Sequence, residues 1–289
     1  MAFAKKTTIA LILVTVSLFI ILYLRQLNVI WFDALLMIFV IFAVFELDSA
    51  FRKNGYKTIR AVLIVALLFI HPMFIYFGLK GAVLVTILSF MIGASIITFN
   101  HNYSYKDLTA TSFILIYPML MLFIFGEINH TTGGLFGIMM VLMVTVLSDT
   151  FAQWTGMAIG GKKLCPTISP NKTVAGACGS YLGGLIGAAA MFLIFEYFLL
   201  FKNVPNVYFV GLTSSPWKSL PLYIVLAILG TTSTQIGDLF ASWMKRQFGL
   251  KDFGTILPGH GGVMDRADSM IFTASLMYLI FLFIPALEQ

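Results

Sequence analysis

The chain has 289 residues, of which 60% are apolar and only 10% are charged. Soluble domains carry about a quarter charged residues, so this composition and the mean hydropathy of +0.96 exclude an ordinary water-soluble protein. The formal net charge of +6 does not indicate a nucleic-acid-binding surface, because the basic residues lie in short loops between apolar runs.

Nine apolar segments approach the length of about 20 residues that a membrane helix needs. They are residues 7–24, 28–46, 60–79, 81–99, 109–126, 133–158, 174–201, 219–244 and 268–286. The first follows Lys5 and Lys6, is long for the apolar region of a signal peptide and lacks a small-residue cleavage site, so we expect a retained helix. The sequence therefore predicts an all-α, polytopic membrane protein with about nine transmembrane helices.

The basic residues favour one side of this membrane protein. Twelve of the 18 Lys and Arg residues lie in the loops after the second, fourth, sixth and eighth segments. The positive-inside rule places these loops in the cytoplasm and both termini outside, although Lys5 and Lys6 weigh mildly against this orientation. We expect a multi-pass protein of the inner cell membrane, with about five N-terminal transmembrane helices in residues 1–126 and about four C-terminal ones in residues 127–289.

Small residues recur every four positions in two neighbouring segments. They are Ala152, Gly156 and Gly160 in the sixth segment, and Gly179, Gly183 and Gly187 in the seventh. Such stripes let two helix backbones approach closely in a membrane. We expect a tightly packed helix pair that gives the loop between them a rigid support. Cys165 and Cys178 have no metal-ligand or disulfide pattern and are interpreted as packing residues.

Carboxylates inside apolar segments are costly, and they indicate a functional site. Asp149 lies deep in the sixth segment with Gln153 one turn later, whereas Asp33 is interpreted as an interfacial residue of the second. Asp265 and Asp268 are three residues apart where the ninth segment begins. In the eighth segment a predicted polar stripe contains Gln235, Asp238, Ser242 and Lys245. An ion-pairing role for Asp149 and Asp238 that is only structural remains an alternative.

Two basic loops accompany these carboxylates, at residues 159–173 and 242–268. The second contains four cations, three carboxylates, His260 and five glycines. Oxygen ligands gathered with Lys, Arg and glycine-rich turns suit Mg²⁺ holding a polyphosphate, and His260 between glycines favours a phosphate contact over simple packing. The residues alone thus indicate a metal-dependent membrane enzyme or transporter that acts on a phosphorylated ligand.

The stretch from 242 to 268 resembles the signature of the phosphatidate cytidylyltransferases (CDP-diglyceride synthases). That signature runs Ser-x-apolar-Lys-Arg, then Lys-Asp, then Pro-x-His-Gly-Gly-apolar-x-Asp-Arg-x-Asp. It is met by Ser242, Lys245, Arg246, Lys251, Asp252, Pro258, His260, Gly261, Gly262, Asp265, Arg266 and Asp268. Residues 148–173 and 235–240 also resemble the family, so the likeness covers the C-terminal half. Ala175 and Ala241 depart from it, since the family usually places Glu at both positions.

The resemblance implies transfer of the cytidylyl group of CTP to phosphatidic acid, giving CDP-diacylglycerol and pyrophosphate. The expected catalytic residues are Asp149, Asp238, Asp265 and Asp268, with Asp238 and Asp265 as ligands of Mg²⁺ and room for a second cation. The expected substrate-binding residues are Ser169, Lys172, Thr173, Lys245, Arg246, Lys251, His260 and Arg266. We expect them in a polar cavity of the C-terminal half that faces the cytoplasm.

The implied partners are CTP, phosphatidic acid and membrane lipids, without nucleic acid, and a homodimer stays open. The alternatives are a related membrane lipid kinase, a cytidylyltransferase for another lipid phosphate, or an inactive paralogue in which the two missing glutamates matter. A secondary transporter is less favoured, because the ionisable clusters are confined to the C-terminal half and no repeat is visible.

Overall fold

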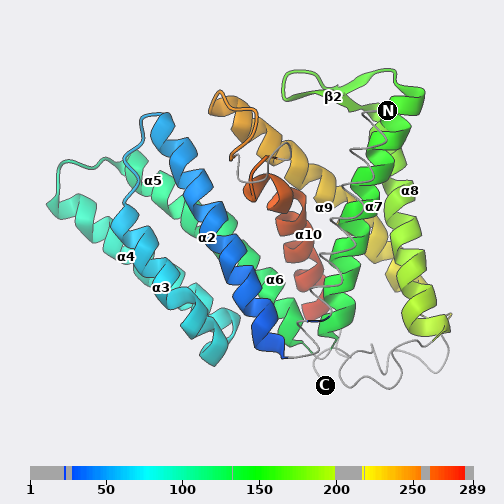
Figure 1. Ribbon diagram of the computed structural model, residues 1–289, viewed down its shortest axis with the longest axis horizontal. Helices are drawn as coiled ribbons and strands as arrows, with labels where there is room; N and C mark the ends of the chain where they lie inside the picture. The colour runs from blue at the N-terminus through cyan, green and yellow to red at the C-terminus, as the bar shows by residue number, and fades with distance from the viewer. Residues whose placement is uncertain are drawn as a thin grey trace.

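The computed structural model describes residues 23, 28–131, 133–198, 217, 219–254 and 261–283. These residues form a body of side-by-side helices with one short hairpin (Figure 1). The helices are α2 (Val29–Lys53), α3 (Arg60–Phe77), α4 (Leu79–Phe99), α5 (Tyr105–Ile114), α6 (Met121–His130), α7 (Gly134–Ile159), α8 (Val174–Phe192), α9 (Leu220–Gln247) and α10 (Met264–Leu282). The π-helical turns η1 (Leu115–Leu120) and η2 (Leu193–Tyr197) extend two of them.

The expectation of a mostly helical, multi-pass membrane protein is confirmed. Seven of the described helices are long and apolar enough to cross a membrane, counting α5, η1 and α6 as one span. Large apolar side chains cover their outer surfaces, as a lipid-facing surface requires: Leu68, Phe69 and Phe90 are examples. Apart from Tyr23, the first predicted segment lies outside the described residues, so the number of nine stays a prediction.

The π-helical turn η1, between α5 and α6, has a local cause. Pro118 lies in η1, and because proline has no backbone N–H it removes one of the regular helical hydrogen bonds. The chain passes this point as a π-helical turn and continues directly into α6. The predicted division after residue 126 falls within α6, which packs against α2, α7 and α10 and so links the two predicted halves.

The connection between α7 and α8, predicted as a loop, is an antiparallel hairpin of β1 (Lys163–Cys165) and β2 (Ser169–Thr173). Gly160 and Gly161 begin this connection with φ values of 65° and 87°, a conformation that other residues rarely adopt. The predicted small-residue stripe is therefore wrong at Gly160. This glycine ends α7 instead of packing against α8, and a Cβ there would meet no atom within 4 Å.

The positive-inside rule predicts that four basic loops share one side of the membrane, and in the structure these loops lie at one end of the helical body (Figure 1). At this end are the turn after α2, the connection from α4 to α5, the hairpin and the turn after α9. Hydrogen bonds tie them together: Asn54 donates to the carbonyl of Phe248, and the Lys57 N–H donates to Asp107. We call this the basic end of the molecule, because the twelve Lys and Arg residues counted above lie in these connections or in the helix turns next to them.

Part of the charge at the basic end serves the fold. Asp48, buried in the last turns of α2, pairs with Arg60 at 2.7 Å and with Arg52 at 3.5 Å, and it accepts a hydrogen bond from Thr58. The turn between α2 and α3 is thereby fixed. At the other end Asp33 is fully buried and pairs with His130 at 2.7 Å, so this predicted interfacial residue has a partner inside the protein.

Candidate active site

The predicted close pair of small-residue helices is α7 and α8. The Cα atom of Gly156 lies close to Gly176, and a Cβ on Gly183 would lie 2.2 Å from the carbonyl oxygen of Leu147. Thr173 begins α8 by accepting a hydrogen bond from the Gly176 N–H at 3.0 Å. The pair therefore fixes Asp149, on α7, relative to the hairpin that precedes α8.

Asp149, on α7, meets the first turns of α10. The hydroxyl of Ser269 lies 3.3 Å from Asp149 Oδ2 and 3.2 Å from Asp268 Oδ1, within hydrogen-bond reach of both. Asp268 is buried, and its Oδ1 also accepts the N–H of Ser269 at 2.7 Å. The sequence analysis did not select Ser269, although a hydroxyl directly after Asp268 was a usable signal.

Asp238, on α9, contacts the hairpin. Lys172 of β2 places its Nζ 2.5 Å from Asp238 Oδ2, with both side chains partly exposed. The charge of Asp238 also acts on Asp149 and on Asp268, so the three carboxylates lie near one another. A basic side chain thus reaches a group of three acidic side chains that comes from three helices.

Asp265 organises the segment before α10. Its Oδ1 pairs with Lys245 Nζ at 2.9 Å, and its Oδ2 accepts the N–H groups of Phe253 and Gly262, each at 2.9 Å. Lys245 reaches Asp268 as well, at 3.9 Å. Lys245 therefore connects Asp265 to the carboxylate group formed by Asp149, Asp238 and Asp268.

The predicted polar stripe of α9 is divided between three neighbours. Gln235 donates to Ser180 and to the carbonyl of Ala177 on α8, whereas Asp238 turns to the hairpin and Lys245 to α10. Helical spacing brings these residues to one side of α9, but the elements packed on that side differ along its length.

The remaining predicted substrate-binding residues lie around the same end. Arg246 donates to the carbonyls of Ile168 in the hairpin and Leu250 after α9, each at 3.2 Å. Ser169 begins β2, Lys251 is exposed beside the turn after α9, and Arg266 lies in the first turn of α10. His260 lies outside the described residues, so its phosphate contact stays a prediction.

Glu46 is a carboxylate of this region that sequence reasoning missed. It lies on α2 in the N-terminal half and is 6% exposed. Its two oxygens accept the backbone N–H groups of Val263 and Met264 at 3.0 and 2.8 Å. The signal was its place at the end of an apolar segment, where a carboxylate is as unusual as Asp149.

The donor set fits a magnesium ion in its chemistry. Asp149, Asp238 and Asp268 offer only carboxylate oxygens, which Mg²⁺ prefers. The described part of the chain contains no group of three or more His, Cys, Asp or Glu side chains placed to hold a metal ion by themselves. Mg²⁺ commonly takes one or two protein carboxylates and completes its shell with water and substrate phosphates, so such a group is not required.

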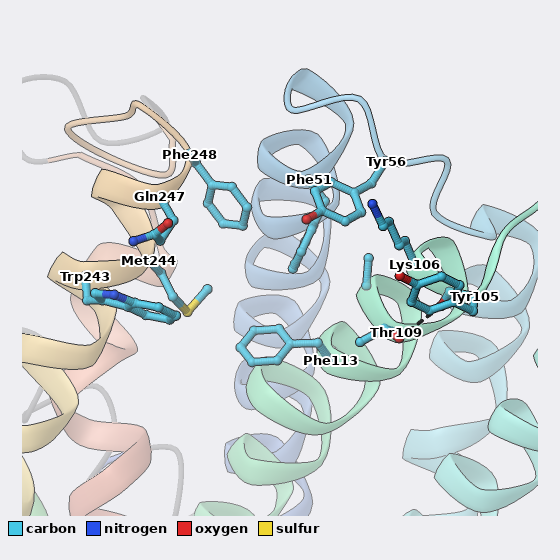
Figure 2. Close-up of a pocket in the computed structure, with 11 residues that line it drawn as sticks. Phe51, Tyr56, Tyr105, Lys106, Thr109, Phe113, Trp243, Met244, Gln247 and Phe248 are labelled. Atoms are coloured by element: carbon cyan, nitrogen blue, oxygen red, sulfur yellow. Dashed lines mark hydrogen bonds between the residues drawn. The ribbon is translucent and has the colours of Figure 1, made fainter.

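A separate cavity of about 420 Å³ lies at the basic end between α2, α5 and α9 (Figure 2). Figure 2 shows Phe51 and Phe248 next to one another at the cavity, in an edge contact with ring centroids 4.8 Å apart, with Phe113 and Trp243 below them and Lys106 at its side. Its lining is aromatic, and it contains none of the predicted site residues among those the structure describes. The predicted polar cavity is not this one and stays a prediction.

The two positions where glutamate is missing have different surroundings. Ala241 is fully buried in the apolar core on α9, where a carboxylate would need a partner. Ala175 is half-buried in the first turn of α8, one residue before the glycine that Thr173 caps. In this chain position 241 contributes to packing and carries no charge.

Comparison with known proteins gives a consistent set of relatives. The chain is 34% identical over 177 residues to a phosphatidate cytidylyltransferase of Thermotoga maritima, covering 61% of this chain and 60% of that protein. A Staphylococcus aureus protein of the same name is 33% identical over 193 residues, covering 67% and 66%. One from Brucella abortus is 41% identical over 148 residues, covering 50% and 47%. The chain thus spans about half to two thirds of the length of these relatives.

A family model covers much more of the chain than these pairwise alignments. The model described as the cytidylyltransferase family matches residues 4–284. This match includes α2 and its Glu46 as well as the segments whose carboxylates and cations meet at the basic end. The chain therefore belongs to the cytidylyltransferase family.

Proposed function

We propose that this protein transfers the cytidylyl group of CTP to phosphatidic acid, releasing pyrophosphate and forming CDP-diacylglycerol. One observation carries the proposal, the set of ion pairs at the basic end. Lys172 pairs with Asp238, and Lys245 pairs with Asp265 and Asp268. Cations and carboxylates from the hairpin, α9 and α10 are thereby gathered within a membrane protein of the cytidylyltransferase family. The names of the relatives add support.

The reaction is a displacement at phosphorus. A phosphate oxygen of phosphatidic acid forms a bond to the α-phosphorus of CTP, and the bond from that phosphorus to the bridging oxygen breaks. Pyrophosphate leaves with the electron pair of the broken bond. In such transfers the protein acts mainly by positioning the reactants and neutralising charge. No covalent intermediate with the protein is needed.

Four cations are proposed to bind the CTP phosphates and the leaving pyrophosphate: Lys245, Arg246, Lys251 and Arg266. Lys245 is fixed by Asp265, so its ammonium group is already oriented before a substrate arrives. Ser169, Lys172 and Thr173 are proposed to bind a phosphate or the lipid headgroup from the hairpin. Lys172 would then exchange its contact with Asp238 for a substrate phosphate.

Asp238 and Asp265 are proposed as ligands of Mg²⁺, with Asp149 and Asp268 as further ligands or hydrogen-bonded neighbours. When bound, Mg²⁺ would neutralise charge on the phosphate oxygens. Asp238 becomes available for this role when Lys172 moves to a substrate. Asp265 keeps one unused lone pair, on Oδ1, because an ionised carboxylate has about four acceptor sites and its Oδ2 already accepts two N–H groups.

The basic end is proposed to face the cytoplasm of a cell with the protein in its inner membrane. Its Lys and Arg residues favour that orientation, and CTP is a water-soluble nucleotide that must reach the site from this side. The lipid substrate has to enter from the membrane. A site at the end of the helical body satisfies both conditions.

Turnover of the purified, detergent-solubilised protein with radiolabelled CTP, phosphatidic acid and Mg²⁺ tests the proposal. We expect label in the lipid phase, an equal amount of pyrophosphate, and loss of both when Mg²⁺ is chelated. A lipid kinase would phosphorylate lipid without releasing pyrophosphate. Product with a different lipid phosphate only would indicate another acceptor, and no product from folded protein would indicate an inactive paralogue.

Lys172→Met is expected to lower kcat/KM for CTP roughly 10- to 100-fold, because a cation that neutralises substrate phosphate is lost. Lys172→Arg should keep most of the activity. Lys80→Met is the matched control, since Lys80 is exposed at the end of the molecule opposite the basic end. Equal activity of Lys172→Met and Lys80→Met would contradict the role of Lys172.

A further inference from the structure

Glu46 brings the N-terminal half of the chain into contact with the signature segment. It belongs to α2, more than 200 residues before the segment that it contacts. The Glu46 carboxylate accepts hydrogen bonds from Val263 and Met264, whose N–H groups begin α10 and have no partner within that helix. A negative charge there is also favoured by the helix dipole. None of the sequence motifs accounts for this residue.

Two glycines of the signature segment make room for this carboxylate. A Cβ on Gly254 would lie 2.1 Å from Glu46 Oε1, and a Cβ on Gly262 would lie 2.4 Å from both oxygens. Neither glycine has a positive φ, in contrast to Gly261 at 82°. Close approach of the Glu46 carboxylate is therefore what requires glycine at positions 254 and 262.

The same backbone positions the reactive groups. The Gly262 N–H that lies beside Glu46 donates to Asp265, as does the Phe253 N–H next to Gly254. Asp265 in turn pairs with Lys245. A shift of residues 262–264 would thus be passed to Asp265 and Lys245 through hydrogen bonds of 2.9 Å.

We propose that Glu46 is a positioning residue: its carboxylate holds residues 262–264 and lies against Gly254, so that Asp265 and Lys245 keep their reactive placement. It acts through the backbone and does not touch substrate. The kinetic part of this inference rests on the proposed function. The alternative is a helix cap that contributes only to the stability of the fold.

A matched pair of variants separates these two roles. Glu127 accepts the Leu79 N–H at 2.8 Å in the first turn of α4, so it caps a helix with the same chemistry at the opposite end of the molecule. Both Glu46→Gln and Glu127→Gln remove one charge from a helix N-terminus. Gln at 46 must also turn its N–H₂ toward one of two backbone donors, whereas Gln at 127 can keep its amide oxygen on the Leu79 N–H. Only Glu46→Gln disturbs the segment that holds Asp265.

In steady-state kinetics we expect Glu46→Gln to lower kcat roughly 10- to 100-fold while KM for CTP changes less than about threefold, because displacement by a fraction of an ångström affects the transition state most. Glu127→Gln should keep kcat within about twofold of the wild-type value, even if its thermal midpoint falls as far as that of Glu46→Gln. Equal kcat in the two variants at equal loss of stability would overturn the proposal.

A suppressor experiment tests the contact itself. Gly262→Ala should lower kcat, because its Cβ would push the Glu46 carboxylate away from the Val263 and Met264 N–H groups. Glu46→Asp withdraws that carboxylate by one methylene group, so the double variant should regain at least about tenfold over Gly262→Ala alone. A double variant no better than Gly262→Ala would contradict a direct contact.

Hydrogen–deuterium exchange supplies a readout that does not need turnover. Glu46→Gln should increase amide exchange of residues 261–266, and Glu127→Gln should leave it unchanged. If the wild-type protein forms no lipid product, the proposed function fails, while this exchange comparison still decides the role of Glu46. Unchanged exchange in Glu46→Gln would overturn the proposal whatever the activity.

Discussion

Asp265→Asn is expected to reduce turnover roughly 100- to 1000-fold while the protein remains folded in detergent or membrane. The reason is that the two oxygens of Asp265 face different donors: Oδ1 faces Lys245 Nζ, and Oδ2 faces the Phe253 and Gly262 N–H groups. An asparagine must place its N–H₂ against one of these sets in either rotamer. The pairing that orients Lys245 is lost together with a proposed magnesium ligand.

The measurement is single-turnover and steady-state formation of labelled lipid, with size-exclusion profile and thermal midpoint as checks of folding. Glu196→Gln is the control, because it neutralises a carboxylate in η2, which continues α8 away from the basic end. Near-normal activity of Asp265→Asn would contradict both the metal role and the orienting role of Asp265.

Lys245→Met provides an internal consistency test for the same pair. Because Lys245 and Asp265 act as a unit, the double variant should be about as slow as the slower single variant. Multiplication of the two losses would mean that each residue acts independently. In that case the 2.9 Å pair would have no joint role in turnover.

The helical architecture and the residues of the candidate site could be predicted because both leave local signals. Apolar length gave each described membrane helix to within several residues, and the acidic residues inside apolar runs indicated Asp149 and Asp238. The four-residue spacing of glycines predicted the contact of Gly183 with α7, which the structure confirms. These features depend on a helical period or on the cost of burying a charge, and both are visible in a single sequence.

The partners of the site residues were not predictable in the same way. The spacing of residues along the chain does not show that Lys172 pairs with Asp238. It also does not show that Gln235 donates a hydrogen bond to Ser180 while Lys245 pairs with Asp265. These pairings depend on which helix packs beside which part of α9. Glu46 was missed for the same reason, since its two backbone donors lie 217 and 218 residues away.

Gly183→Ala is expected to destabilise the protein by about 1–3 kcal/mol and to lower its thermal midpoint by roughly 2–10 °C. The added Cβ would lie 2.2 Å from the Leu147 carbonyl oxygen and 2.8 Å from the Cβ of Phe151. A backbone atom cannot turn aside as the end of a flexible side chain can. α7 and α8 must separate instead, which removes close contacts over the length of the pair.

Gly187→Ala is the matched comparison, because its Cβ would meet the nearest atom, the Met143 carbonyl oxygen, at 3.0 Å. The neighbour then has to give by only a few tenths of an ångström, so we expect a clearly smaller loss of stability. Thermal unfolding of both variants in the same detergent measures the difference. Equal losses would mean that the small-residue stripe does not set the distance between α7 and α8.

Separation of these helices also has a predicted effect on activity. α7 carries Asp149, and the hairpin before α8 carries Lys172, which pairs with Asp238. An outward shift of α8 would move Lys172 relative to Asp149, so Gly183→Ala should lower kcat even at a temperature where the protein is fully folded. If kcat stays normal while the thermal midpoint falls, the α7–α8 pair contributes stability only. A loss of both would mean that close packing of two glycine-rich backbones fixes the distance between the acidic group and the basic hairpin.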